Sequence, residues 1–249
     1  MDIDSFFDLA EKAFAGDVTS QSELGECFYN GNVVNLDYNQ AYIWLTKAAE
    51  QGDVLAQKLV GLCYFNGNGV EQNYEEAVLW WTKAAEQNNA VALRNLGICY
   101  ENGFGVEKDY EKALCLYTKS AELGNFRAIV NLGYYYDTIA QNLDKAVEHY
   151  RKAAELGDAF SQNNLGICYE VGKGVEEDYE KAIYWYAKAA EQGIAEAQDN
   201  LGRCYKNGSG INQNYEKAVY WLTKAAEQGN DIAIKRLSEL KKKGTLSDE

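Results

Sequence analysis

The stretch AEAQDNLGRCYKNGSGINQNYEKAVYWLTKAAEQG, residues 195–229, decides the fold because five further stretches of the chain follow the same pattern. One glycine recurs at an equivalent place in all six, with spacings of 36, 36, 36, 33 and 36 residues: Gly25, Gly61, Gly97, Gly133, Gly166 and Gly202. A fixed period of this size indicates a solenoid, in which each repeat buries its apolar face only against its neighbours. We therefore expect residues 1–249 to form one continuous solenoid domain, and solenoids present binding surfaces more often than reactive pockets.

Each repeat has the pattern of two helices joined by a turn. In the third repeat Ala92, Leu96 and Tyr100 recur at four-residue steps, so they fall on one helical face. The second helix of each repeat begins after a capping residue: Asp37, Asn73, Asp109, Asn142, Asp178 and Asn214. It ends at a residue that tolerates a positive φ: Gly52, Asn88, Gly124, Gly157, Gly193 and Gly229. The pattern predicts about thirteen antiparallel helices in an all-α, right-handed superhelix.

The repeats occupy six consecutive segments, which we number repeats 1 to 6: 17–52, 53–88, 89–124, 125–157, 158–193 and 194–229. Residues 4–16 are predicted to form an N-terminal half repeat, and residues 230–243 a C-terminal capping helix. Repeat 4 lacks three residues and the Gly-x-Gly turn, and in repeat 1 Val33 replaces the second turn glycine.

The motifs of repeat 6 resemble the Sel-one-like repeat (SLR) family of the tetratricopeptide (TPR) superfamily. The motif A-x-A-x-x-x-L-G-x-x-Y spans Ala195–Tyr205, a G-x-G turn follows at Gly208–Gly210, and W-x-x-K-A-A-E-x-G spans Trp221–Gly229. The resemblance covers nearly the whole chain. It implies an adaptor that assembles protein complexes and binds its partner on a concave surface, a groove lined by the first helices. It implies no reaction and no cofactor.

The charge of the chain argues against two classes of partner. Its 24 Lys and Arg residues are outnumbered by 38 Asp and Glu residues, which gives a formal net charge of −14. Nucleic acids and anionic membrane surfaces are bound by basic patches, so neither is expected here. No apolar run approaches the ~20 residues of a membrane-spanning helix. The N-terminus has no secretory signal pattern, and we expect a cytoplasmic protein.

The sequence contains no arrangement typical of an enzyme, a metal site or a cofactor site. Five cysteines share one repeat position, and adjacent helices there are spaced too widely for disulfides, so we expect buried thiols: Cys27, Cys63, Cys99, Cys168 and Cys204. Family resemblance leaves open a Cys99–Cys115 disulfide, which we consider less favoured than free thiols. His149 is the only histidine and takes a tryptophan position, where we interpret it as a packing residue.

A second stripe of side chains runs along each first helix, away from the core positions, and we name it the first-helix stripe. It is apolar in the middle repeats and polar at both ends, which favours an apolar-anchored peptide or protein segment as ligand. The candidate stripe residues are Leu55, Leu62, Phe65, Val91, Arg94, Ile98, Arg127, Tyr134, Phe160, Asn163 and Ile167. Leu62, Ile98, Tyr134 and Ile167 fit burial inside their own repeat equally well, whereas Leu55, Phe65 and Phe160 are predicted to be more exposed. Beside the stripe lies an amide row that suits either a ligand backbone or a structural role: Asn95, Asn131, Asn164 and Asn200.

Three functions compete on this pattern. The first is a non-enzymatic adaptor that binds a peptide or protein on the first-helix stripe. The second is an acidic cytoplasmic inhibitor of a basic partner, such as an antidote to a toxin, which the net charge of −14 suggests. The third is an enzyme, and it is disfavoured because no acid–base set converges.

Overall fold

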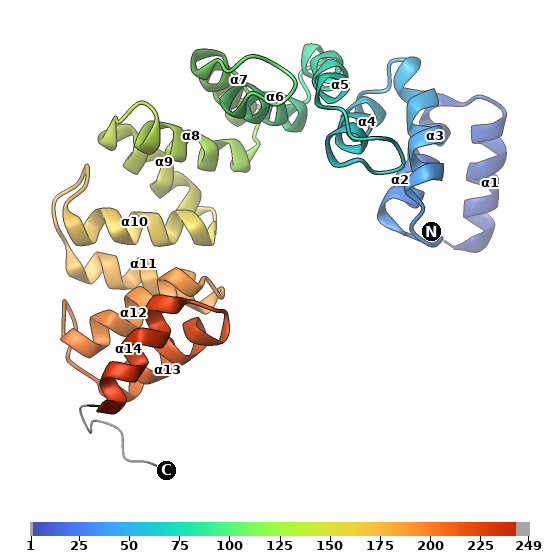
Figure 1. The fold of residues 1–249 in the computed structure, drawn as a ribbon. Helices are drawn as coiled ribbons and strands as arrows, with labels where there is room; N and C mark the ends of the chain where they lie inside the picture. Colours follow the sequence, from blue (N-terminus) through green and yellow to red (C-terminus); the bar gives the residue numbers. More distant parts are fainter. Residues whose placement is uncertain (1, 243–249) are drawn as a thin grey trace. The chain divides into compact units, whose positions relative to one another are not determined.

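The computed structural model describes residues 2–242, which contain fourteen α-helices and no strand (Figure 1). The all-α solenoid class is thereby confirmed. The expected number of about thirteen helices was one too low, because six pairs and a half repeat at either end make fourteen. The described chain forms two compact units, which meet after Ala128 within α8. We call them the N-terminal unit and the C-terminal unit and describe each by itself.

The helices are almost uniform in length. The N-terminal unit holds α1 Ile3–Phe14, α2 Val18–Asn30, α3 Tyr38–Glu50, α4 Val54–Asn66, α5 Tyr74–Glu86, α6 Ala90–Asn102 and α7 Tyr110–Glu122. Helix α8, Phe126–Thr138, spans the boundary. The C-terminal unit continues with α9 Leu143–Glu155, α10 Ala159–Val171, α11 Tyr179–Glu191, α12 Ala195–Asn207, α13 Tyr215–Glu227 and α14 Asp231–Lys242.

The local signals that place these helices act as predicted. All six expected caps precede the second helices, and Asp109, for example, accepts a hydrogen bond of 2.9 Å from the backbone N–H of Lys112. The six closing residues all have a positive φ, including Asn88 at 61°. Val33 also has a positive φ, of 70°, at the place where the turns of repeats 2, 3, 5 and 6 have glycine. A β-branched residue in this region is strained, which makes Val33 an outlier of the repeat.

The two helices of a repeat approach each other closely at the glycine that sets the period. A Cβ atom at Gly97 would lie 2.5 Å from Cε1 of Tyr117, and Gly166 faces Tyr186 in the same way. Tyr117 and Tyr186 are fully buried. The missing side chain on the first helix therefore makes room for a large one on the second, which explains why glycine recurs there.

A ladder of glutamine pairs joins successive repeats, and the sequence analysis missed it. Gln57 Nε2 donates to the carbonyl of Ala49 in the preceding repeat at 3.2 Å, and Gln57 Oε1 accepts from Gln87 Nε2 at 3.0 Å. Equivalent pairs are Gln21 with Gln51, Gln162 with Gln192, and Gln198 with Gln228. Repeat 3 has Leu93 and Leu123 at the two places instead. In repeat 3 both glutamines are thus replaced together. This paired replacement is the sequence signal by which the contact could have been found.

Candidate functional site

Residues of the first-helix stripe line a cavity of about 200 Å³ in the N-terminal unit. Helix α4 contributes three residues, α6 contributes three, and the buried Trp81 of α5 contributes one wall. The lining residues are Leu62, Phe65, Asn66, Trp81, Arg94, Asn95 and Ile98. Five of these belong to the predicted set, and the structure thus brings stripe residues of repeats 2 and 3 together. Asn66 and Trp81 were missed.

Phe65 is more enclosed than its sequence position suggested. Its ring centroid lies 5.3 Å from that of Trp81, 5.1 Å from that of Tyr74 and 5.7 Å from that of Phe104. Phe65 is partly buried in this aromatic cluster, in which Tyr74 and Trp81 come from α5 and Phe104 from the connection between α6 and α7. Truncating Phe65 would therefore disturb the fold as well as the cavity, so it is a poor probe of binding.

The cavity depends on two apolar side chains of repeat 2, Phe65 and Trp81, at positions that are polar in other repeats. In repeats 3 and 5 the corresponding pairs are hydrogen bonded, Tyr117 to Glu101 at 2.6 Å and Tyr186 to Glu170 at 2.7 Å. In repeat 2 the same two places hold Phe65 and Trp81. Two rings replace a phenol and a carboxylate, and the space beside them is lined mostly by carbon. The cavity between repeats 2 and 3 therefore depends on this apolar pair and is not a general consequence of the repeated fold.

Two basic residues stand one helical turn before the apolar lining. Lys58 precedes Leu62 by four residues on α4, and Arg94 precedes Ile98 by four residues on α6, so each pair lies on one face. Both bases are partly buried. Burial lowers the pKa of Lys58, although the charge of Glu26 opposes this effect. Burial also lowers the pKa of the Arg94 guanidinium. The stripe is locally basic in a chain whose net charge is −14.

In the C-terminal unit, charged residues of the first helices pair with one another. Arg203 on α12 donates two hydrogen bonds of 2.6 Å to the carboxylate of Glu170 on α10. Burial raises the pKa of Glu170, but hydrogen bonds from Arg203 and Tyr186 outweigh it and hold the pKa below its usual value. Arg236 of α14 pairs with the buried Asp199. These contacts join successive repeats and leave fewer polar groups for a ligand.

The amide row has a structural place in this unit. Asn200 Nδ2 donates to Asn163 Oδ1 at 3.2 Å, and Arg203 donates to Asn200 Oδ1 at 3.4 Å. Asn163 is 7% exposed and Asn95, in the other unit, is 8% exposed. Asn131 and Asn164 are partly buried.

The remaining predicted residues differ widely in exposure. Phe160 is 62% exposed, Tyr134 54%, Val91 41% and Ile167 36%. Arg127 is exposed, and Leu55 is partly buried against the core of repeats 1 and 2. None of these residues lines the cavity beside Trp81.

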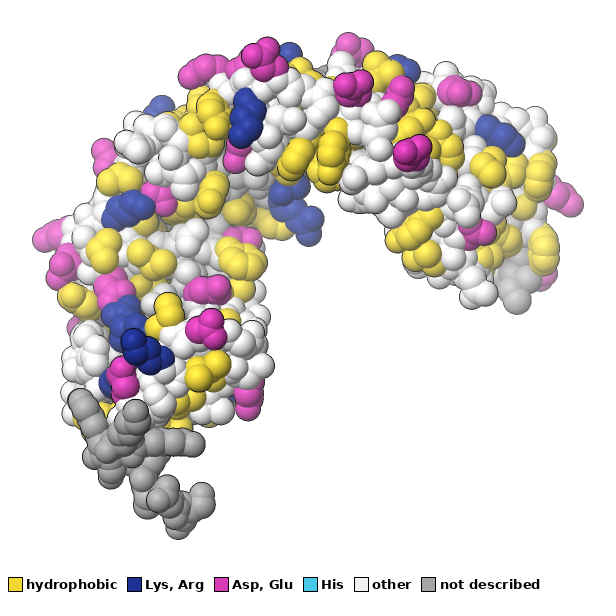
Figure 2. Space-filling model, viewed as in Figure 1, with side chains coloured by type: hydrophobic (Ala, Val, Ile, Leu, Met, Phe, Trp, Pro, Cys, Tyr) yellow, Lys and Arg dark blue, Asp and Glu magenta, His cyan; other side chains and the backbone are white. Residues whose placement is uncertain are grey.

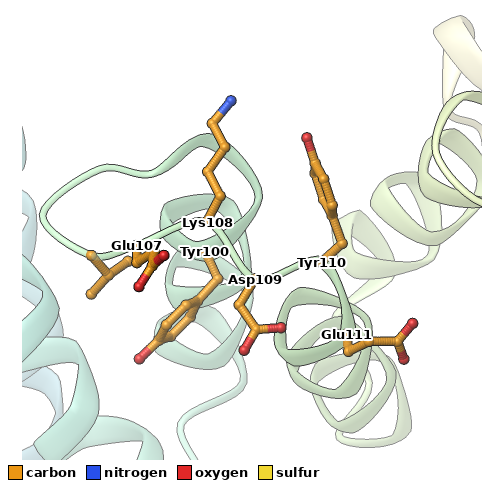
Figure 3. A pocket seen from close by; sticks show the side chains of 7 residues that line it. Tyr100, Glu107, Lys108, Asp109, Tyr110 and Glu111 are labelled. Carbon is orange, nitrogen blue, oxygen red and sulfur yellow. The ribbon is translucent and has the colours of Figure 1, made fainter.

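A larger hollow of about 750 Å³ lies beside the connection between α6 and α7 (Figure 3). Its side chains diverge, with Lys108 and Tyr110 pointing one way and Asp109 and Tyr100 the other. A similar hollow lies at the equivalent connection before α11, lined by Asp178 and its neighbours. Since Asp109 and Asp178 already cap their helices, we attribute both hollows to the repeated shape of the connection.

The cysteines and the single histidine show the features of packing residues and not of a reactive site. All six cysteines are free thiols in the described chain, and burial raises the pKa of Cys63 and Cys99 to about 12. His149 stacks on Tyr136 with ring centroids 5.4 Å apart, and burial lowers its pKa. Residues 2–242 contain no cluster of three metal-ligating side chains. No helix within that range has the length and apolar character needed to cross a membrane.

The family model of the Sel1 repeat matches six segments: 18–53, 54–89, 90–125, 127–158, 159–194 and 195–230. The chain belongs to the Sel1 repeat family. Proteins of this family generally mediate protein–protein interactions, and the family is typically a non-enzymatic scaffold. The resemblance seen in the repeat motifs is thereby confirmed. The matched segments begin one or two residues after the predicted repeats.

Solved structures of the same family are similar to this chain. A protective antigen of uropathogenic Escherichia coli with an SLR fold is 36% identical, with a TM-score of 0.85, over 93% of this chain and 50% of its own. This chain thus spans half the length of that relative. A Sel1 repeat protein of Oxalobacter formigenes is 37% identical, with a TM-score of 0.76, over 84% of this chain and 85% of its own.

A more distant structure shares the fold alone. An immunity protein of Pseudomonas aeruginosa is 20% identical, with a TM-score of 0.53, over 87% of this chain and 83% of its own. No curated protein sequence matches the chain.

Proposed function

We propose that this chain is a non-enzymatic adaptor that holds a segment of a partner protein on the first-helix stripe of its N-terminal unit. The observation that carries the proposal is the cavity beside Trp81, which is lined by four predicted stripe residues and by Asn95 of the amide row. Pockets for drug-sized ligands usually measure about 300–1,000 Å³. A space of about 200 Å³ suits one apolar side chain of a partner better than a cofactor. The free thiols support a cytoplasmic location.

Site-specific photo-crosslinking tests this function. A photoreactive residue replaces Asn66, which is exposed and lines the cavity, or Lys119, which is exposed on α7 and serves as the matched control. We expect position 66 to crosslink one segment of a partner, mapped by mass spectrometry, and position 119 to give no crosslink to that segment. Ile98→Trp, which fills the cavity, should abolish the crosslink. A crosslink that survives Ile98→Trp would remove the cavity from the proposal.

A second candidate is the acidic inhibitor of a basic partner, which the net charge of −14 favours. On the face drawn in Figure 2, acidic side chains are spread over both units and do not gather in one patch. Binding through so diffuse a charge would weaken steeply with added salt, because surface charges are screened. Binding through the cavity would change little between low and physiological salt. Measuring the partner's dissociation constant at several salt concentrations therefore separates the two candidates.

A further inference from the structure

We propose that the cavity takes an apolar side chain from an acidic peptide segment, and that a carboxylate of this segment pairs with Lys58. The inference rests on the proposed function and names the chemistry of the partner. It follows from the positive charge of Arg94 in the cavity lining and of Lys58 one helical turn before Leu62, which is opposite in sign to the charge of the chain as a whole.

Lys58 carries the argument because it is partly buried without an acidic partner. Among residues 2–242, no Asp or Glu oxygen lies within 4.0 Å of its Nζ. Glu26 acts on it only from a greater distance. Removing an ammonium group from water costs free energy that a carboxylate would offset. An acidic ligand would supply that carboxylate.

In the C-terminal unit, basic residues on the first helices have acidic partners within the chain. Its stripe bases pair with acids of a neighbouring repeat: Arg203 with Glu170 at 2.6 Å, Lys206 with Glu239 at 3.0 Å, and Arg236 with Asp199. The stripe position of Lys58 in repeat 2 is filled by Asp199 in repeat 6. Internal acids thus neutralise the bases of one unit, whereas Lys58 in the other has none.

Lys58 is linked to the apolar cavity by its position on α4 and by one backbone hydrogen bond. Its side chain lies one turn before Leu62 on α4, and its backbone carbonyl accepts a hydrogen bond of 3.1 Å from Nε1 of Trp81. Leu62 and Trp81 both line the cavity. Arg94 contributes a second positive charge to the lining itself. A ligand that places an apolar side chain in the cavity therefore meets positive charge within a residue or two along its backbone.

The net charge of −14 does not prevent this pairing. At physiological salt the Debye length is about 8 Å, so most acids of the chain are screened from a bound peptide. A contact pair with Lys58 lies well inside that length and is screened less. A basic segment would instead bring like charges together at the cavity, which is unfavourable.

A random twelve-residue peptide display library, selected against the full chain at physiological salt, tests the inference. Enriched peptides are synthesised and their dissociation constants measured by fluorescence anisotropy, each beside a version in which Glu or Asp becomes Gln or Asn. The variants are Lys58→Met, which keeps most of the apolar stem, and Lys119→Met as the matched exposed control. Ile98→Trp and Asn66→Trp fill the cavity from two sides, and circular dichroism confirms that each variant folds.

We expect enriched peptides with Asp or Glu within a few residues of an apolar side chain. Neutralising that acid should weaken binding to the wild-type chain and to Lys119→Met about tenfold, but to Lys58→Met by less than about twofold. Cavity-dependent peptides that are indifferent to the acid would overturn the inference and leave the proposed function standing. If no enriched peptide loses affinity on both cavity-filling variants, the proposed function fails and the inference with it.

Discussion

The glutamine pair of repeat 2 allows the energetics of the solenoid to be tested within a single chain. Gln57 is 4% exposed, and its Oε1 accepts from Gln87 Nε2 at 3.0 Å. Gln87 itself is exposed. In repeat 3 the chain has Leu93 and Leu123 at these places, so an apolar pair is already accommodated by the same backbone. We therefore predict that Gln57→Leu and Gln87→Leu are strongly coupled.

The expected magnitudes follow from which polar atoms lose a partner. Gln87→Leu removes the donor to a buried amide oxygen, which costs about 1–3 kcal/mol. Gln57→Leu removes the buried amide together with its hydrogen bonds, and the buried leucine offsets much of this loss. In the double variant no buried side-chain atom of the pair is left unsatisfied. We expect the double variant to be more stable than Gln87→Leu alone, with a coupling energy of about 1–2 kcal/mol.

Urea unfolding of the full chain, followed by circular dichroism, measures the four free energies of unfolding of this cycle. The matched control is the reverse cycle in repeat 3, Leu93→Gln with Leu123→Gln, in which the double variant should again be more stable than the singles suggest. Additivity of the two changes within about 0.5 kcal/mol would refute the reasoning. It would mean that the ladder contributes packing and not paired hydrogen bonds.

Three further predictions concern the backbone and the ion pairs. Gly97→Val should lower the free energy of unfolding by about 2–3 kcal/mol, because a Cβ there meets Tyr117, and a thermal midpoint unchanged from wild type would contradict this close approach. Val33→Gly should raise the free energy of unfolding by about 1 kcal/mol in urea titrations, because it relieves the positive φ; a decrease would show that its packing outweighs its strain. The pKa of Glu170 is held low in the fold, so its contribution to stability is present above the unfolded pKa of about 4.3 and is lost as pH falls through the folded pKa. Glu170→Gln should therefore reduce the loss of stability between pH 6 and pH 3, measured as the free energy of unfolding in urea at each pH. A loss as steep as in the wild type would show that this ion pair does not cause the acid destabilisation.

Short-range signals in the sequence were sufficient to predict the helices. Asp109 accepts from a backbone N–H three residues away, and Asn88 ends its helix through its own φ, so both effects act within one turn of the chain. The close approach at Gly97 was also predictable, because the glycine recurs at every period. The stripe could also be placed on one face of each first helix, because residues three and four positions apart lie on the same side of a helix.

The site depended on contacts that spacing does not describe. Phe65 was expected to be exposed, yet it lies among rings from α5 and from the connection between α6 and α7, which helical spacing does not predict. Lys58 and Arg203 are both basic residues on first helices. Only the structure shows that Glu170 pairs with Arg203 while no acid of the described chain pairs with Lys58.

The sequence by itself determined the repeat, the helix ends and the face of each helix, because these follow from interactions between residues a few positions apart. Only the tertiary structure decided where a space remains and which charges are neutralised. These depend on how the ends of long side chains from three helices meet, and such distances are set by packing between helices and not by the period of the chain.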